Sequence, residues 1–260
     1  MNTPLWQAIR KAQGKQKRVA LALALFTILL LAGAIVAVVL VSTGRLRPTP
    51  TNQLQSDYLK MQDSESAAVR QAKAAGRNVN TDEAVVRARA GLALLEIQAG
   101  DLSSALKLSA RLAKGAPNNA EAQYAYGAAL SASGRVDESL ARFQTALGLA
   151  RDADTDLQRD ILTGYANALI SAHKPEEAYS NLKQAAALPP ASVDLYVRAA
   201  TVALGQKNYQ DAAEMYLRAQ SYDPSDATVI AGLRQLQRAR PADVKAAQQS
   251  LEQQGQANNE

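Results

Sequence analysis

Residues 91–105 read GLALLEIQAGDLSSA, an apolar helical stretch that breaks at a short turn around Gly100 and then resumes. The same order of helix, turn and helix returns three times downstream. Taking Ala93 as the reference point, the matching residues are Gly127, Ala166 and Ala200, so the register advances by 34, 39 and 34 residues. A helix–turn–helix unit repeated at this period predicts an all-α solenoid, because each unit alone cannot bury its apolar face.

This pattern resembles the tetratricopeptide repeat (TPR) family, whose 34-residue unit has small residues at its eighth, twentieth and twenty-seventh positions. Eleven of the twelve residues at these positions are small. They are Ala93, Ala105 and the larger Leu112; Gly127, Ser139 and Ala146; Ala166, Ala178 and Ala185; and Ala200, Ala212 and Ala219. The resemblance implies about four repeats within residues 81–226, at 86–119, 120–153, 159–192 and 193–226.

The repeats depart from the family pattern in two ways. The aromatic residue of the fourth position is present only as Tyr196. The turn glycine is kept at Gly100 and Gly134 but is replaced by His173 and Lys207. With no acid–base partner nearby in the sequence, His173 is expected to be an exposed turn residue.

Five extra residues separate the second and third repeats, and the segment 152–156 (DADTD) there resembles the start of a calcium-binding loop. Leu157 stands where such a loop requires glycine, and Thr163 stands where a bidentate glutamate closes it. We therefore predict a longer inter-repeat loop in which Thr155 or Asp156 caps the next helix.

Segments outside the repeats complete the array. Residues 53–80 predict a polar helix, either a stalk or N-terminal cap packed on the repeats or a coiled-coil segment. Residues 227–253 predict capping helices, which the ends of a solenoid require. Residues 254–260 are expected to form a disordered polar tail.

An apolar run at residues 19–41 precedes the repeats and predicts a transmembrane signal anchor, since a helix of this length would extend about 35 Å. A cleaved signal peptide is the alternative, but the run is too long and lacks a small-residue cleavage site. The basic segment 1–18 is expected to stay in the cytoplasm. A Pro-containing linker at 42–52 then leads to a repeat domain in the periplasm or an equivalent compartment.

The charge distribution excludes several functions. The chain has 29 Lys and Arg against 24 Asp and Glu, but five of the basic residues lie in segment 1–18, which contains no acid. The remaining body is neutral, so it offers no basic surface for nucleic acid. With no cysteine and one histidine, the chain also lacks the material for thiolate or histidine metal sites and serine–histidine triads. We therefore expect no enzyme and no cofactor.

The TPR resemblance also implies a concave groove on the first helix of each repeat, as the site for a protein partner. Its predicted residues are Arg87, Leu94, Tyr124, Ala128, Asn167, Ile170, Val197 and Thr201. Relatives that hold the C-terminal carboxylate of chaperones use Lys and Asn clamps, and only Asn167 matches here. A peptide with apolar anchors suits this groove better, although a partner bound at an edge of the array stays an equal alternative.

Together these features predict a bacterial inner-membrane protein with a single span through residues 19–41 and a periplasmic TPR scaffold. Its expected function is to mediate protein–protein interaction, as an accessory or assembly factor of a cell-envelope complex. One alternative is a permanent structural subunit of a larger membrane complex. Another is an import-type receptor on an organelle, with its repeats in the cytosol.

Overall fold

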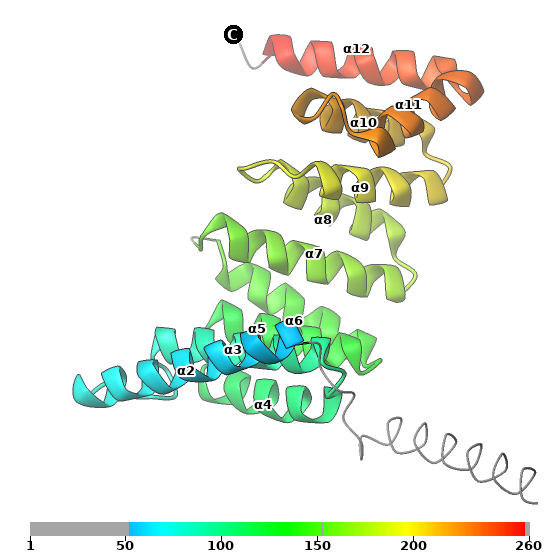
Figure 1. The fold of residues 1–260 in the computed structure, drawn as a ribbon. Helices are drawn as coiled ribbons and strands as arrows, with labels where there is room; N and C mark the ends of the chain where they lie inside the picture. Colours follow the sequence, from blue (N-terminus) through cyan, green and yellow to red (C-terminus); the bar gives the residue numbers. More distant parts are fainter. Residues whose placement is uncertain (1–51, 152, 258–260) are drawn as a thin grey trace, which may run out of the picture.

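The computed structural model describes residues 52–151 and 153–257, and every regular element in these ranges is an α-helix (Figure 1). The helices are α2 (Asn52–Ala74), α3 (Glu83–Gln98), α4 (Leu102–Gly115), α5 (Ala120–Ala132), α6 (Val136–Leu149), α7 (Thr155–Ser171), α8 (Pro175–Ala187), α9 (Val193–Gly205), α10 (Tyr209–Tyr222), α11 (Ala227–Ala239) and α12 (Pro241–Ala257). Hairpins α3–α4, α5–α6, α7–α8 and α9–α10 stack into an elongated array (Figure 1). The predicted all-α repeat array is confirmed.

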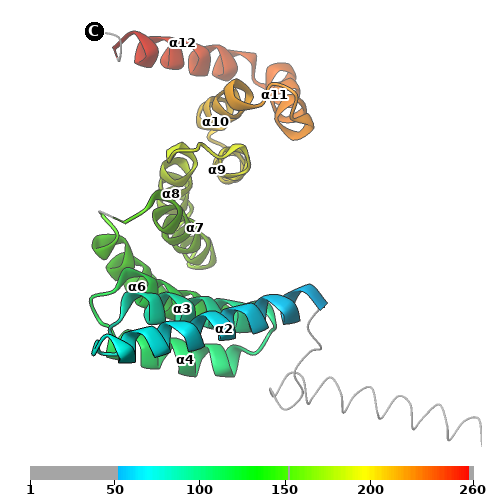
Figure 2. The same ribbon diagram turned by 60° about the vertical axis from the view of Figure 1, so that its left-hand side comes forward.

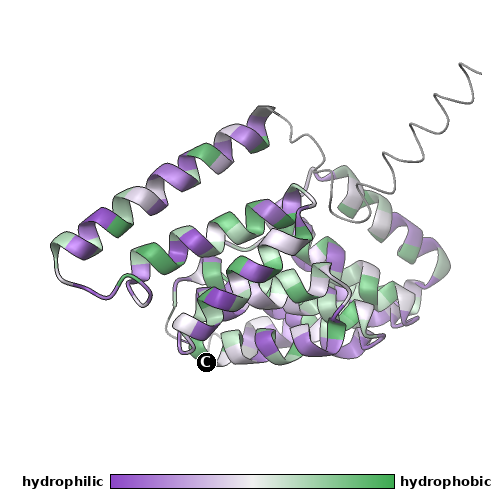
Figure 3. Cartoon of the chain, turned by 90° about the horizontal axis from the view of Figure 1, so that it is seen from below, coloured by the Kyte–Doolittle hydropathy of each residue, from purple (hydrophilic) through white to green (hydrophobic). Residues whose placement is uncertain are grey.

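The predicted span at residues 19–41 and its flanks 1–18 and 42–51 lie outside the described residues. Among the helices that the structure describes, none has the length and hydropathy needed to cross a bilayer. Hydrophilic and hydrophobic residues alternate along these helices (Figure 3), as in helices that pack on one side and face water on the other.

Short polar side chains set where most of the helices begin. Asp154 caps α7, because its carboxylate accepts a hydrogen bond from the Leu157 backbone N–H at 2.8 Å. The prediction that Thr155 or Asp156 would be the cap is therefore wrong, since both already belong to the first turn of the helix.

At the other end of the chain, α12 continues through Ala257, so the tail expected to be disordered from residue 254 begins within this helix.

The four turns inside the repeats share one left-handed backbone geometry. Their φ angles are +77° at Gly100, +76° at Gly134, +57° at His173 and +60° at Lys207. In each case the following residue donates its N–H to the carbonyl five residues earlier, as in the 2.9 Å bond from Lys174 to Leu169. This bond fixes the turn whether or not glycine is present, and His173 is exposed, as predicted.

Close helix packing in the array depends on the small residues of the repeats. All twelve residues at the eighth, twentieth and twenty-seventh positions are buried. Most of them are alanines with no exposed surface, including Ala93, Ala166 and Ala212. A side chain with only a methyl group lets two helix backbones approach, so these positions determine where the helices cross.

Two aromatic side chains each fill a socket at a glycine of the next helix. A Cβ atom on Gly164 of α7 would lie 2.9 Å from Cε1 of Phe143. A Cβ atom on Gly232 of α11 would lie 2.5 Å from Cζ of Tyr216. Both distances are shorter than any stable carbon–carbon contact, so each aromatic ring occupies the space that another side chain would need.

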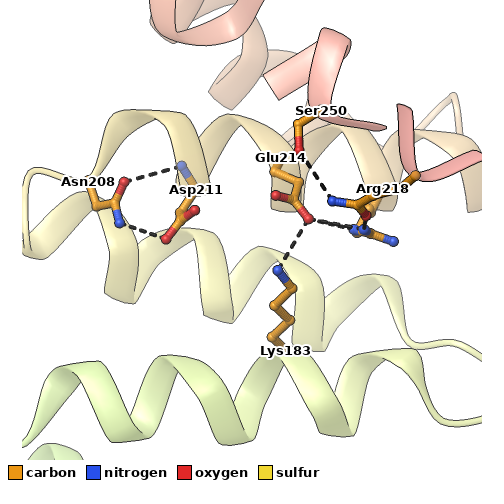
Figure 4. A network of polar contacts seen from close by, with 7 residues as sticks. Lys183, Asn208, Asp211, Glu214, Arg218 and Ser250 are labelled. Atoms are coloured by element: carbon orange, nitrogen blue, oxygen red, sulfur yellow. Dashed lines mark hydrogen bonds and ion pairs between the residues drawn. The ribbon is translucent and has the colours of Figure 1, made fainter. Parts of the chain in front are cut away.

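A buried carboxylate connects three successive hairpins near the C-terminal end (Figure 4). The Glu214 side chain, 8% exposed, lies 3.2 Å from Nζ of Lys183 on α8 and 3.0 Å from the Arg218 guanidinium on its own helix. Arg218 also donates to the Gln254 side chain of α12, at 2.5 Å. These contacts tie α8, α10 and α12 together, because a buried charge is stable only when it is paired.

Helix α2 packs antiparallel on α3 and caps the first repeat. The Tyr58 hydroxyl donates to Glu96 at one end of the pair, at 3.4 Å, and Ala72 lies in one buried cluster with Val85 at the other end. At the opposite end of the array, α12 lies across α10 (Figure 2) and buries Val244 there.

The contacts between these glycines and the aromatic rings predict that an added methyl group lowers the stability of the fold. Replacing Gly164 or Gly232 by alanine should destabilise the chain by about 1 to 3 kcal/mol, because Phe143 and Tyr216 have to move. The measurement is chemical denaturation followed by circular dichroism. Gly148→Ala is the matched control, since no atom lies within 4 Å of its added Cβ and alanine favours helix. Equal stability of all three variants would contradict the prediction.

Candidate functional site

The predicted groove residues lie on α3, α5, α7 and α9, and side-chain contacts join α3 to α5 and α7 to α9 across the repeats. Nε of Arg87 lies 2.8 Å from Glu121, the residue 34 positions later in the chain. Farther along the array, Nη2 of Arg198 donates to the Asn167 side chain at 2.6 Å. The charge of Arg87 is therefore already paired within the protein, and the pairing raises the pKa of its guanidinium.

The first repeat has a groove that α2 borders. Leu94 is half-buried in a hollow of about 430 Å³ between α2 and α3, together with Met61 and Gly91. A Cβ atom on Gly91 would lie 2.8 Å from Cε of Met61, so this glycine allows α2 to approach α3. The place of α2 beside this site was not predicted from the sequence, although a glycine inside the helix pattern is a signal for close backbone approach.

The second repeat contributes packing rather than an open surface. The Tyr124 ring centroid lies 6.1 Å from that of Phe143, and Ala128 is half-buried. Burial, together with the nearby Asp160 carboxylate, raises the pKa of Tyr124 to about 12. The Tyr124 ring therefore packs against Phe143, which its sequence position alone did not reveal.

The third and fourth repeats present the most open part of the groove. Ile170 is 43% exposed, an unusual value for a large apolar side chain. Asn167 and Thr201 are also exposed, and the Thr201 hydroxyl donates to the Val197 carbonyl at 2.9 Å. Val197 itself is half-buried and packs on the hydrophobic core. A partner would thus meet Asn167, Ile170 and Thr201 first.

The described residues offer little for chemistry. Across 52–151 and 153–257, no three His, Asp or Glu side chains converge as a metal-ion site. His173 is exposed in its turn.

Comparison with protein families decides the assignment. The profile described as tetratricopeptide repeat matches residues 96–159 and 169–236, together just over half of the chain. The chain belongs to the tetratricopeptide repeat family. TPR proteins are typically non-enzymatic scaffolds with protein or peptide partners, so this TPR chain is a scaffold for protein–protein interaction.

Solved structures agree with the TPR fold at low sequence identity. BtubC (BKLC) from P. vanneervenii is 16% identical, with a TM-score of 0.55 over 81% of this chain and 93% of that one. YrrB, a TPR protein described as having an unusual peptide-binding site, is 14% identical, with a TM-score of 0.50 over 71% of this chain and 88% of that one. No curated protein sequence matches the chain. These likenesses concern the TPR fold alone.

A second hollow of the TPR array, of about 580 Å³, lies outside the predicted groove. Its lining residues are Glu65, Asn80, Arg89, Leu108, Arg111, Leu112, Lys114 and Gly115, from α2, the following loop, α3 and α4. The hollow was not predicted from the sequence, because it forms only where α2 and α4 pack against the same helix, α3. The available signal is that segment 102–115 contains three basic residues and no acidic one.

Burial of Tyr124 predicts a pH dependence of stability. A phenol whose pKa rises from 10.0 to about 12 on folding stabilises the fold fully below pH 10 and loses this contribution as the pH rises toward 12. Tyr124→Phe should therefore lose less stability than the wild type between pH 9 and pH 11.5. Urea unfolding at both pH values measures this difference.

Tyr222→Phe is the matched control for this measurement, because the Tyr222 side chain is 58% exposed. If Tyr124→Phe and Tyr222→Phe respond alike to alkaline pH, burial of Tyr124 is not the cause.

Proposed function

We propose that this TPR chain is a membrane-anchored scaffold on the extracytoplasmic side of a bacterial inner membrane, where it positions another protein of a cell-envelope complex. The observation that carries the proposal is the combination of a basic segment at 1–18, an apolar run at 19–41 and a TPR array. Basic residues on one flank of a span favour the cytoplasmic side for that flank. The array then lies on the other side.

The groove residues of repeats three and four are the proposed contact surface. Ile170 supplies an apolar anchor, and the exposed Asn167 and Thr201 supply hydrogen-bonding groups around it. An extended or helical peptide segment with an apolar side chain fits this combination, since apolar anchors give affinity and polar neighbours fix register. The neutral charge of the body agrees with a partner chosen by shape more than by charge.

A topology experiment tests the membrane part of the proposal. Alkaline phosphatase folds into an active enzyme only after export, so a fusion after Glu260 should be active in bacterial cells. A fusion after Arg18 is the control and should be inactive. An inactive fusion after Glu260 would overturn the proposal and favour a receptor with cytosolic repeats.

Site-specific photo-crosslinking tests the contact surface. A photoreactive amino acid at Ile170 or Thr201 should crosslink one protein partner, because both side chains are exposed in the groove. Gln184 is the matched control, since it is also exposed but lies on α8, the second helix of its repeat. Crosslinking from Gln184 without crosslinking from Ile170 would place the partner at the outer helices.

A partner that stays bound through detergent extraction in fixed stoichiometry would identify a structural subunit.

A further inference from the structure

We propose that the hollow between α2, α3 and α4 is a second binding site, which takes an acidic segment of a protein partner. It lies apart from the groove and does not depend on the groove being used.

The walls of the hollow come from helices that are distant in sequence. Leu108, Arg111, Leu112 and Gly115 follow one another at spacings of three, one and three residues, which puts them on one face of α4. The opposite side is formed by Glu65 of α2, Asn80 of the next loop and Arg89 of α3. The volume of about 580 Å³ is within the 300–1,000 Å³ range of ligand sites.

The charges in this hollow do not balance. Arg89 is paired with Glu65 at 2.9 Å, which uses the one carboxylate that lines the site. Arg111 and Lys114 have no ion-pair or hydrogen-bond partner for their side chains anywhere in the described ranges 52–151 and 153–257. Helix α4 carries Lys107 as well and contains no acidic residue. The hollow therefore has a surplus of positive charge that a carboxylate would neutralise.

In the fourth repeat, the arginine that corresponds to Arg111 is neutralised by a carboxylate of this same chain. In the repeat register, Arg111 of α4 corresponds to Arg218 of α10, and Lys107 corresponds to Glu214. Glu214 lies between Arg218 and Lys183 and is 8% exposed, so the carboxylate closes the space between α8 and α10 (Figure 4). In the first repeat this acid is missing.

The missing carboxylate and the apolar floor together define the chemistry of the partner. A Glu or Asp side chain from outside would neutralise Arg111 and Lys114, with charge-assisted hydrogen bonds from Arg111. Leu108 is half-buried and Leu112 is buried at the base of the hollow. They would cover apolar side chains next to the acid. A peptide segment in which acidic and apolar residues alternate meets both conditions.

Charge reversal with a matched control tests this site. The full-length chain is prepared in non-ionic detergent, and its binding to two short fluorescein-labelled peptides, one of alternating Glu and Leu and one of alternating Lys and Leu, is measured by fluorescence anisotropy. The double variant Arg111→Glu, Lys114→Glu should weaken binding of the acidic peptide by about tenfold or more. It should gain binding of the basic peptide.

The control variant Arg234→Glu, Arg238→Glu makes the same change of net charge on exposed positions of α11. It should bind the acidic peptide within about twofold of the wild type, because it leaves the hollow intact. Circular dichroism melting verifies that both double variants are folded. Equal weakening in the two double variants would show that only overall charge matters, and absence of saturable binding to the wild type would overturn the site itself.

Discussion

Close approach of helix backbones at small side chains is the constraint on which the rest of this structure depends. Ala93, Ala166 and Ala212 are fully buried, and each lies where two helices of a hairpin meet. Larger side chains there would push the helices apart and leave voids around the leucines that fill the core, at a cost that grows with the empty volume. The groove on the first helices and the outer surface of the second helices both follow from this spacing.

The two ends of the array use the same constraint with different partners. At the N-terminal end, Gly91 admits Met61 of α2, so a helix outside the repeats borders both hollows. At the C-terminal end, α12 buries Val244 and Ala247 in the core that begins in the third repeat. The terminal helices thus cover apolar surface that a solenoid would otherwise expose, and they shape the surfaces available to partners.

The period and the small residues were sufficient to predict the hairpins, because both are local properties of the sequence. The left-handed turns at His173 and Lys207 were not predictable from residue type, since a hydrogen bond closing the helix holds them there. Tyr124 was placed on the correct helix, but its burial depends on Phe143 from the next helix and on how α7 approaches. The basic hollow required knowledge that α2 and α4 flank one helix, which no sequence spacing contains.

The pairing of side-chain sizes between neighbours has a consequence for the modularity of this solenoid. Phe143 needs the glycine at position 164, and Tyr216 needs the glycine at position 232, whereas the corresponding position in the fourth repeat is Arg198. Exchanging or duplicating hairpins would bring an aromatic ring against an arginine stem or leave a glycine socket empty. Although the repeats share one register, the interfaces between successive hairpins are not equivalent. Each hairpin is therefore matched to its own neighbours, and the hairpins of this array are not interchangeable.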